Sequence, residues 1–358
     1  MSSYQYQPEQ APVFRGNYPR TIEEMSAWHK KADIEPVVEP DLPIIDAHHH
    51  LWDNVNGEYL IRQMTDDIRE SGHHVISTVH VQAHSMVRAS GPEELKSLGE
   101  TEFLSGMAAM SDSGRYGPTR VCEGIVGYVD FRYGEQIGSI LDQHIAVSGG
   151  RFRGIRQGLT WTGEKAIADY LPSVAPHLLL SDPKFRVGFA QLAPRNLSFD
   201  AWLFHPQIGE LIDLAKAFPE TKIVLDHIGG RLGIGSHAFR FKEEFVQWQA
   251  DLKALAKCPN VYVKIGGLGM VYGGFGFHAE YKPLNSDDLV RVWRPFVMAG
   301  IEAFGPHRSI MESNFPVDKQ CCTYQALWNA LKKITASFSQ DEKNRMYHGA
   351  AREFYRLS

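Results

Sequence analysis

Two histidines, His48 and His50, are the residues of this chain whose types and spacing most suggest chemistry. They follow an apolar segment, and positions 44–53 read Ile-Ile-Asp-Ala-His-His-His-Leu-Trp-Asp. Side chains two apart on a β-strand point to the same face, so His48 and His50 are expected to project together from the strand end. Such a pair can hold a metal ion or a reacting group. The alternative is that both are ordinary polar residues that close a strand.

Histidines also end two later segments with strand character. Positions 222–230 read Lys-Ile-Val-Leu-Asp-His-Ile-Gly-Gly and place His227 after an apolar run, and positions 197–207 lead to His205. Between the two, 208–218 has apolar residues at helical spacing, which indicates one strand–helix unit. The pattern therefore predicts His205 and His227 at corresponding ends of consecutive parallel strands.

Strand-like and helix-like segments alternate along most of the chain, which favours a parallel α/β fold. A chain of 358 residues is long enough for a (β/α)₈ TIM barrel, which typically needs about 250 residues. Several of the expected strands are near-continuous apolar runs, as strands covered on both faces should be. The expected strands are 43–47, 75–82, 124–131, 151–156, 197–203, 222–226, 261–265 and 308–312.

Two regions fall outside this repeating pattern. Residues 1–42 are polar, interrupted by proline and carry several aromatics, so we expect an N-terminal arm before a barrel domain over 43–358. The segment 84–119 is too long for a plain connection between a strand and a helix. It is expected to form a long insertion after the second strand, near the mouth of the barrel.

Composition excludes several classes of protein. The formal net charge is −5 and the charges are mixed in sign, so nucleic acid is not an expected partner. The four cysteines form no CxxC pair, which fits a reducing compartment. The first residues do not resemble a signal peptide, and no stretch reaches the roughly 18 apolar residues of a membrane span. These features predict a soluble cytoplasmic protein that does not bind membranes.

The order of the motifs resembles the amidohydrolase-2 branch of the amidohydrolase superfamily. The resemblance rests on Ile-Asp-Ala-His-His-His-Leu-Trp-Asp at 45–53, Arg-Gly-Ile-Arg at 153–156, His-Pro at 205–206, Leu-Asp-His-Ile-Gly-Gly at 225–230 and Glu-Ser-Asn-Phe-Pro-Val at 312–317. The branch includes lactonases and, among its relatives, decarboxylases. The resemblance implies a TIM barrel with its site at the carboxyl ends of the strands.

The resemblance also implies roles for individual residues. His48 and His50 match the metal ligands or substrate-orienting histidines of the first strand, and His205 matches a ligand of the fifth. His227 matches a histidine that polarises or protonates the substrate or positions water. Arg153 and Arg156 match arginines that bind substrate carboxylates. Because they lie three apart, they should point to opposite faces of an ideal strand, and Arg156 is favoured for the site.

The chain departs from the family pattern at the end of the eighth strand. The family usually carries an aspartate there, which binds metal and acts as the general base, and this chain has Asn314. A neutral amide cannot accept a proton from water. Glu312 lies two residues earlier, on the same strand face, and is the expected replacement base. The alternative is that Glu312 is a buried structural partner of an arginine.

Metal binding is an open question from the sequence. His48, His50 and His205 could together bind Zn²⁺, which lowers the pKa of a bound water to about 7. Against this, the loss of the aspartate removes an anionic ligand, and some lactonases of the family work without metal. Two further residues are candidates for substrate contact: Gln82, which could equally be a satisfied strand-end amide, and Lys264, which could equally pair with a carboxylate.

These observations predict a hydrolase that opens a lactone or related cyclic ester of a small carboxylated compound. The catalytic candidates are His227, Glu312 and Asn314, and Arg156 would hold a substrate anion. One alternative is a non-oxidative decarboxylase, and another is a catalytically silent barrel that serves as a binding or scaffold protein. The expected partner is a small-molecule substrate, and the N-terminal arm makes a homodimer a hypothesis to test.

Overall fold

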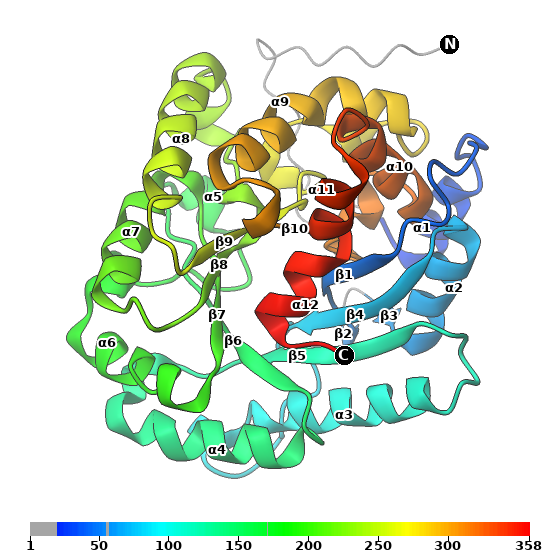
Figure 1. Cartoon of the computed structure of the whole chain (residues 1–358). Helices are drawn as coiled ribbons and strands as arrows, with labels where there is room; N and C mark the ends of the chain where they lie inside the picture. Colours follow the sequence, from blue (N-terminus) through cyan, green and yellow to red (C-terminus); the bar gives the residue numbers. More distant parts are fainter. Residues whose placement is uncertain (1–19, 55–56, 170) are drawn as a thin grey trace.

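Eight parallel strands form the centre of the computed structural model, which describes residues 20–54, 57–169 and 171–358 (Figure 1). In sheet order the strands are β1 (Ile44–His49), β4 (Val75–Val81), β5 (Arg120–Gly127), β6 (Phe152–Gly158), β7 (Ser198–Trp202), β8 (Ile223–Leu225), β9 (Val261–Ile265) and β10 (Ser309–Met311). The ring is completed between its first and last strands. The N–H of His50 donates to the carbonyl of Phe315 at 2.8 Å, and the N–H of Asn314 donates to the carbonyl of His48 at 2.8 Å. The expected (β/α)₈ barrel is confirmed.

Helices surround this barrel on the outside (Figure 1). The α-helices are α1 (Ile22–His29), α2 (Ile61–Ser71), α3 (Leu98–Asp112), α4 (Ile137–Val147), α5 (Lys165–Ala168), α6 (Pro183–Phe189), α7 (Ile208–Ala217), α8 (Phe241–Leu255), α9 (Ser286–Phe304), α10 (Tyr324–Ile334), α11 (Gln340–Asn344) and α12 (Ala350–Tyr355). A small antiparallel pair, β2 (Trp52–Asn54) and β3 (Gly57–Tyr59), follows β1. Connections that follow the strands carry short 3₁₀ turns; Asp226–Ile228 holds His227 of the candidate site, and Val317–Gln320 follows β10.

Each of the eight expected strands is present, with ends that differ by up to four residues. The largest difference is at β5, which begins at Arg120 and ends at Gly127. It ends there because Asp130 starts a 3₁₀ turn, in which its side chain accepts from the N–H of Arg132. The expected insertion after the second strand contains a regular barrel helix, since α3 packs against β5 and α4. The additional length lies in the loop before α3, over 82–97.

Alternating side chains of the strands divide the barrel interior into two layers. Near the amino ends, the inward residues are apolar and pack against Phe354 and Tyr355 of α12, which closes that end. This layer contains Ile45, Val79, Val126, Val224, Tyr262 and Ile310. Two residues further along three of these strands, the inward residues are charged, namely Asp226, Lys264 and Glu312. Because side chains two residues apart on a strand share a face, a charged layer lies above the apolar layer, towards the carboxyl ends of the strands.

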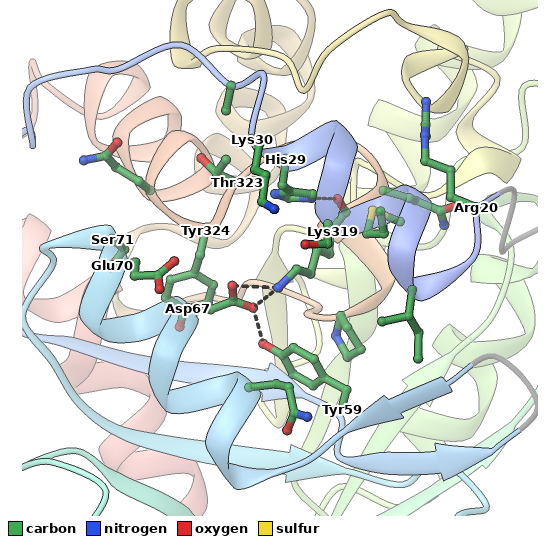
Figure 2. A pocket seen from close by; sticks show the side chains of 18 of the residues that line it. Arg20, His29, Lys30, Tyr59, Asp67, Glu70, Ser71, Lys319, Thr323 and Tyr324 are labelled. Carbon is green, nitrogen blue, oxygen red and sulfur yellow. Dashed lines mark hydrogen bonds and ion pairs between the residues drawn. The ribbon is translucent and has the colours of Figure 1, made fainter.

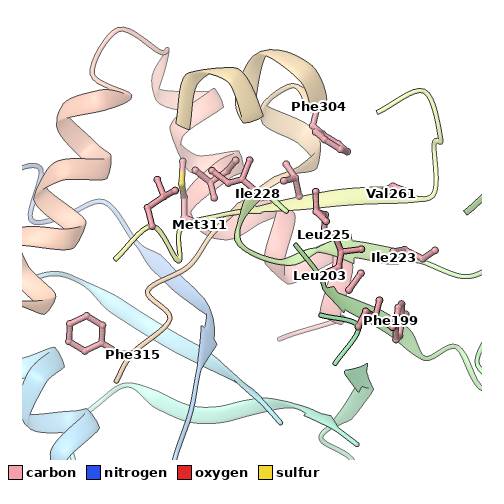
Figure 3. Packing of buried hydrophobic residues seen from close by; sticks show 14 of the residues in the cluster. Phe199, Leu203, Ile223, Leu225, Ile228, Val261, Phe304, Met311 and Phe315 are labelled. Atoms are coloured by element: carbon pink, nitrogen blue, oxygen red, sulfur yellow. The ribbon is translucent and has the colours of Figure 1, made fainter. Parts of the chain in front are cut away.

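The outer faces of the same strands pack against the helices. Phe199, Ile223, Leu225 and Val261 lie in one cluster with Phe304 of α9, and Figure 3 shows this packing. All five are at most 4 % exposed. Truncating such a side chain to alanine usually costs about 2–5 kcal/mol, so this layer holds the strand ends, and with them the site, in place.

The described part of the expected N-terminal arm, residues 20–42, contacts connections that follow β9 and β10. Trp28 donates from its indole N–H to the carbonyl of Glu280 at 2.9 Å, and a ring nitrogen of His29 lies 2.7 Å from the carbonyl of Lys319 (Figure 2). Residues 1–19 of the expected arm lie outside the described residues. Among the helices of the described chain, none has both the length and the apolar character required to cross a membrane.

Candidate functional site

A buried cluster of three residues, which we call the Glu312 cluster, joins the carboxyl ends of three strands. It consists of Glu312 after β10, His227 after β8 and His48 of β1. One oxygen of Glu312, Oε1, lies 2.7 Å from Nδ1 of His227, and the other, Oε2, lies 2.9 Å from Nδ1 of His48. The backbone N–H of His227 also donates to Oε1 at 3.2 Å. Glu312 and His48 are fully buried and His227 is 3 % exposed. One carboxylate therefore hydrogen-bonds to the His227 ring and lies within ion-pair distance of the His48 ring.

The two rings differ in their hydrogen-bond partners. Both ring nitrogens of His48 face cations that only donate hydrogen bonds: Nε2 lies 3.2 Å from Nη1 of Arg156, and Nδ1 lies 3.3 Å from Nζ of Lys264. In His227 the contact with Glu312 places the proton on Nδ1. Nε2 of His227 is left with a lone pair, which is what a general base needs.

Two consecutive glycines after β9 make room for the Glu312 cluster. A Cβ on Gly267 would lie 2.2 Å from Nδ1 of His227, and a Cβ on Gly266 would lie 2.5 Å from Cγ of Glu312. Gly267 also has a φ of +64°, which favours glycine. The Gly-Gly pair at the end of β9 is therefore required by the close approach of these two side chains.

Arg156 of β6 reaches the same cluster and is held in place by Gln82, which follows β4 on the far side of β5. Its Nε donates to the side-chain oxygen of Gln82 at 2.9 Å, and its Nη2 donates to the Gln82 carbonyl. Gln82 thus orients the arginine. His50 lies beside them: its Nδ1 is 2.7 Å from the carbonyl of Val81, and its ring centroid is 4.9 Å from that of His48. The expected pairing of His48 and His50 on one face is present.

Beneath His48, three buried charges form an ion-pair network. The ammonium of Lys264 lies 2.6 Å from Oδ2 of Asp200 and 3.0 Å from Oδ1 of Asp226. It is also 3.3 Å from Nδ1 of His48, and the hydroxyl of Tyr355 donates to Asp200 at 2.6 Å. Lys264 is fully buried. Its contacts are therefore with carboxylates and His48, so it positions the site from below.

Burial controls the protonation of these groups. Burial, together with the charge of Lys264, holds the pKa of His48 well below its usual value, and burial with the charge of Arg156 does the same for His50. Both rings are therefore neutral at pH 7. Burial alone would lower the pKa of Lys264, but the carboxylates of Asp200 and Asp226 outweigh it and raise that pKa, so the ammonium stays charged.

Three predicted site residues lie apart from this cluster. Arg153 lies near the amino end of β6 and donates to the carbonyl of Gly150 at 2.7 Å, because three residues along a strand reverse the face. Asn314 turns away, with its Nδ2 donating to Asp318 at 2.8 Å. His205 lies in a second group, with Nε2 3.5 Å from Glu244. The trio His48, His50 and His205 is therefore not assembled as one ligand set.

Two groups of described residues have the composition of a metal site. In each, two imidazoles and a carboxylate bring ligand atoms within 4.8 Å of one another: His48, His227 and Glu312 in one, His205, His237 and Glu244 in the other. These are donor types that Zn²⁺ accepts. In the first group, however, the Lys264 ammonium lies 3.3 Å from His48 Nδ1, and Arg156 occupies Nε2. Both ring nitrogens of His48 thus already face protein cations, so this ring offers no free nitrogen to a metal ion, and the reaction is argued from the side chains.

Sequence reasoning missed the two aspartates of the network. Asp226 directly precedes His227, and Asp200 stands in the otherwise uncharged strand Ser-Phe-Asp-Ala-Trp. A charged residue inside an apolar strand is a usable signal, because such residues are almost never fully buried unless they are paired. Their partner, Lys264, was found in the sequence, but the pairing itself depends on how β7, β8 and β9 are placed around the barrel.

Comparison with known proteins agrees with this architecture. The family model described as Amidohydrolase matches residues 45–357. An uncharacterised protein, y4mH, from Sinorhizobium fredii is 35 % identical over 88 % of this chain and 99 % of its own length. An L-fucono-1,5-lactonase from Burkholderia ambifaria is 24 % identical over 87 % of this chain and 95 % of its own.

A solved structure shows the same fold. The crystal structure of an amidohydrolase from Burkholderia multivorans with bound Zn superposes with a TM-score of 0.66. The two sequences are 22 % identical, and the match covers 88 % of this chain and 99 % of the other. At this identity the likeness establishes the barrel and leaves the reaction to be argued from the site.

Proposed function

Because this chain belongs to the amidohydrolase family, we propose that it is a hydrolase that opens a lactone bearing hydroxyl or carboxylate groups. The observation that carries the proposal is the Glu312 cluster, in which a buried carboxylate fixes the proton of His227 on Nδ1. This leaves Nε2 of His227 as a base at the carboxyl end of the barrel, where TIM-barrel enzymes carry their active sites. The match to an L-fucono-1,5-lactonase supports a sugar-type lactone as the first substrate class to test.

The first step in this proposal is the activation of water. Nε2 of His227 takes a proton from a water molecule as the water oxygen attacks the lactone carbonyl. The ring then becomes an imidazolium, whose charge is stabilised by Glu312 at 2.7 Å from Nδ1. In this scheme Glu312 has the positioning role that an aspartate has in a serine-protease triad, and the base is the histidine. This proposal gives Glu312 an orienting role in place of the base role that the sequence suggested.

Arg156 supplies positive charge for the oxyanion that forms on the carbonyl oxygen. It is 8 % exposed, and it is already oriented by Gln82 before substrate arrives. A fixed, desolvated donor of this kind stabilises a developing charge more than a mobile one does. When the tetrahedral intermediate collapses, the ring oxygen leaves and takes the proton held on His227. The product is a hydroxy acid.

A mass-spectrometric screen of lactones tests the proposal. The protein is incubated with a panel of five- and six-membered sugar lactones. The masses of the products are compared with those from the same reactions with a His227→Asn variant. We expect at least one lactone to gain the mass of one water with the wild type and to remain unchanged, above the spontaneous rate, with the variant.

Two outcomes would count against it. The first is hydrolysis at equal rates by wild type and variant, which would remove His227 from the mechanism. The second is loss of carbon dioxide from an aromatic or unsaturated acid in a parallel panel, which would replace the hydrolase with a decarboxylase.

A further inference from the structure

A buried carboxylate, that of Glu100, lies outside the Glu312 cluster and takes no direct part in the proposed reaction. Glu100 is in the first turn of α3 and is 1 % exposed. Its Oε1 accepts from two backbone N–H groups of the loop that follows β4, that of Ala83 at 2.8 Å and that of Ser85 at 3.1 Å. Acidic side chains are almost never fully buried unless they are paired, and here the pairing is with the backbone of this loop.

One peptide group of the loop connects Glu100 to Arg156. The N–H of the peptide between Gln82 and Ala83 donates to Glu100, and the carbonyl of the same peptide accepts from Nη2 of Arg156. The N–H of Gln82 pairs with the carbonyl of Val126 on β5 at 2.9 Å, so the chain enters this peptide from a fixed strand end. Because a peptide group is planar, its N–H and C=O move together. Rotation of this peptide would therefore break the bonds to Glu100 and to Arg156 at once.

The backbone beyond this peptide is strained. His84 and Met86 both have a φ of +55°, in the left-handed region that residues other than glycine rarely adopt. The two N–H groups that donate to Glu100 lie on either side of His84 in the chain. Strained residues persist only where the surrounding structure fixes them, and Glu100 supplies two of the contacts that fix this loop.

The charge of Glu100 acts on the same peptide as the charge of Arg156. Burial raises the pKa of Glu100 to about 7, and the N–H groups of Ala83 and Ser85 and the charge of Arg156 act in the opposite direction. A negative charge at the N–H and a positive charge at the carbonyl polarise a peptide in the same sense, which strengthens both hydrogen bonds. The arrangement is therefore strongest while Glu100 is ionised.

We propose that Glu100 is a positioning residue, which holds the guanidinium of Arg156 in place through the peptide between Gln82 and Ala83. The side-chain oxygen of Gln82 accepts from Nε of Arg156 at 2.9 Å, and the Gln82 carbonyl, fixed by Glu100, accepts from Nη2. Two fixed acceptors on one guanidinium prevent its rotation, so Nη1 stays beside His48. The effect on catalysis rests on the proposed hydrolysis, in which Arg156 stabilises the oxyanion, whereas the positioning itself does not depend on it.

Nuclear magnetic resonance of arginine side chains tests the positioning without a substrate. The arginines of the protein are labelled with ¹⁵N, and the Nε–H signal of Arg156 is identified as the one that Arg156→Lys lacks. Its hydrogen exchange is measured at about pH 8, where Glu100 is ionised. We expect exchange at least about tenfold faster in Glu100→Met, because the guanidinium loses one fixed acceptor. Glu100→Gln keeps an oxygen but loses the charge, and its exchange should be faster than in wild type and slower than in Glu100→Met.

Glu123→Met is the matched control. Glu123 is also a buried carboxylate that accepts from a backbone N–H, that of Ser358 at 2.9 Å, and it lies in the amino-terminal half of β5. This variant should leave the Arg156 signal unchanged even where it lowers stability. Urea unfolding establishes that each variant is folded, and Glu100→Gln carries the comparison if Glu100→Met is not.

A double-mutant cycle tests the effect on catalysis with the lactone that the mass screen identifies. Glu100→Met should lower kcat at least about tenfold and change KM by less than about threefold, because Arg156 acts on the oxyanion. In an Arg156→Met background the same change should lower kcat by less than about twofold, because its effect passes through Arg156.

Unchanged hydrogen exchange of Arg156 in folded Glu100→Met overturns the proposal. Equal acceleration in Glu123→Met overturns it as well, because general destabilisation would then account for the change. An equal loss of kcat with and without Arg156 would overturn the route through this arginine. If no lactone is hydrolysed, the proposed reaction fails, and the exchange measurement still decides the positioning by itself.

Discussion

Replacing Glu312 with glutamine removes the charge that orients His227 while keeping the size of the side chain. In the proposed reaction His227 becomes an imidazolium beside Glu312, and the two contacting atoms are 2.7 Å apart. With charge centres about 4 Å apart and an effective dielectric constant of about 20, the attraction is about 4 kcal/mol. A barrier increase of that size slows a reaction by about 10³-fold. We therefore expect Glu312→Gln to lower kcat by about three orders of magnitude.

The assay is steady-state hydrolysis of whichever lactone the mass screen identifies, followed by proton release in weak buffer. Glu302→Gln makes the same chemical change at an exposed position of α9 and serves as the matched control. Chemical unfolding of both variants establishes that the barrel is intact before rates are compared. A kcat for Glu312→Gln within tenfold of wild type, in a folded protein, would refute the orienting role of Glu312.

Three further predictions concern the surroundings of the cluster. Gly267→Ala places a Cβ 2.2 Å from His227 Nδ1 and should lower kcat at least about tenfold. The control is Gly305→Ala, which has the same kind of backbone strain at a φ of +72° but open space around it, and it should keep full activity. Equal kcat values for the two variants would refute the packing argument. Lys264→Met leaves Asp200 and Asp226 buried without their cation and should cost about 3–5 kcal/mol in urea unfolding, and a loss below about 1 kcal/mol would contradict the network. Burial raises the pKa of Asp318 from 3.8 to about 7. Its protonated form therefore stabilises the fold below about pH 4, and that contribution is lost as the pH rises to 7. Asp318→Asn should flatten this part of the curve of unfolding free energy against pH, and parallel curves for wild type and variant would contradict the raised pKa.

Local pattern was enough to predict the barrel and the first strand of the site. The eight strands were found because strands buried on both faces are continuous apolar runs, and the two-residue period correctly placed His48 and His50 on one face. The same period distinguished Arg156, which reaches the cluster, from Arg153, which does not. These predictions depend only on neighbours in sequence.

The remaining features of the site depend on contacts between distant segments. Glu312 and His227 are 85 residues apart, and their hydrogen bond depends on how β8 and β10 flank β9. His205 follows β7 as expected, but the chain forms a 3₁₀ turn there, His205–Gln207, and the ring faces Glu244 of α8 instead of the Glu312 cluster. Asn314 was assigned by its position in a motif, whereas its conformation directs the amide to Asp318.

The direction of pH change in weakly buffered solution tests the central claim most directly. Lactone opening releases a proton and decarboxylation consumes one, so one indicator experiment with wild type and His227→Asn separates the two reactions and the role of the base. We predict acidification with a sugar lactone and a rate at least about 10²-fold lower in the variant, as expected for loss of a general base. Alkalinisation with a carboxylic acid substrate, or acidification that is undiminished in His227→Asn, would contradict the account.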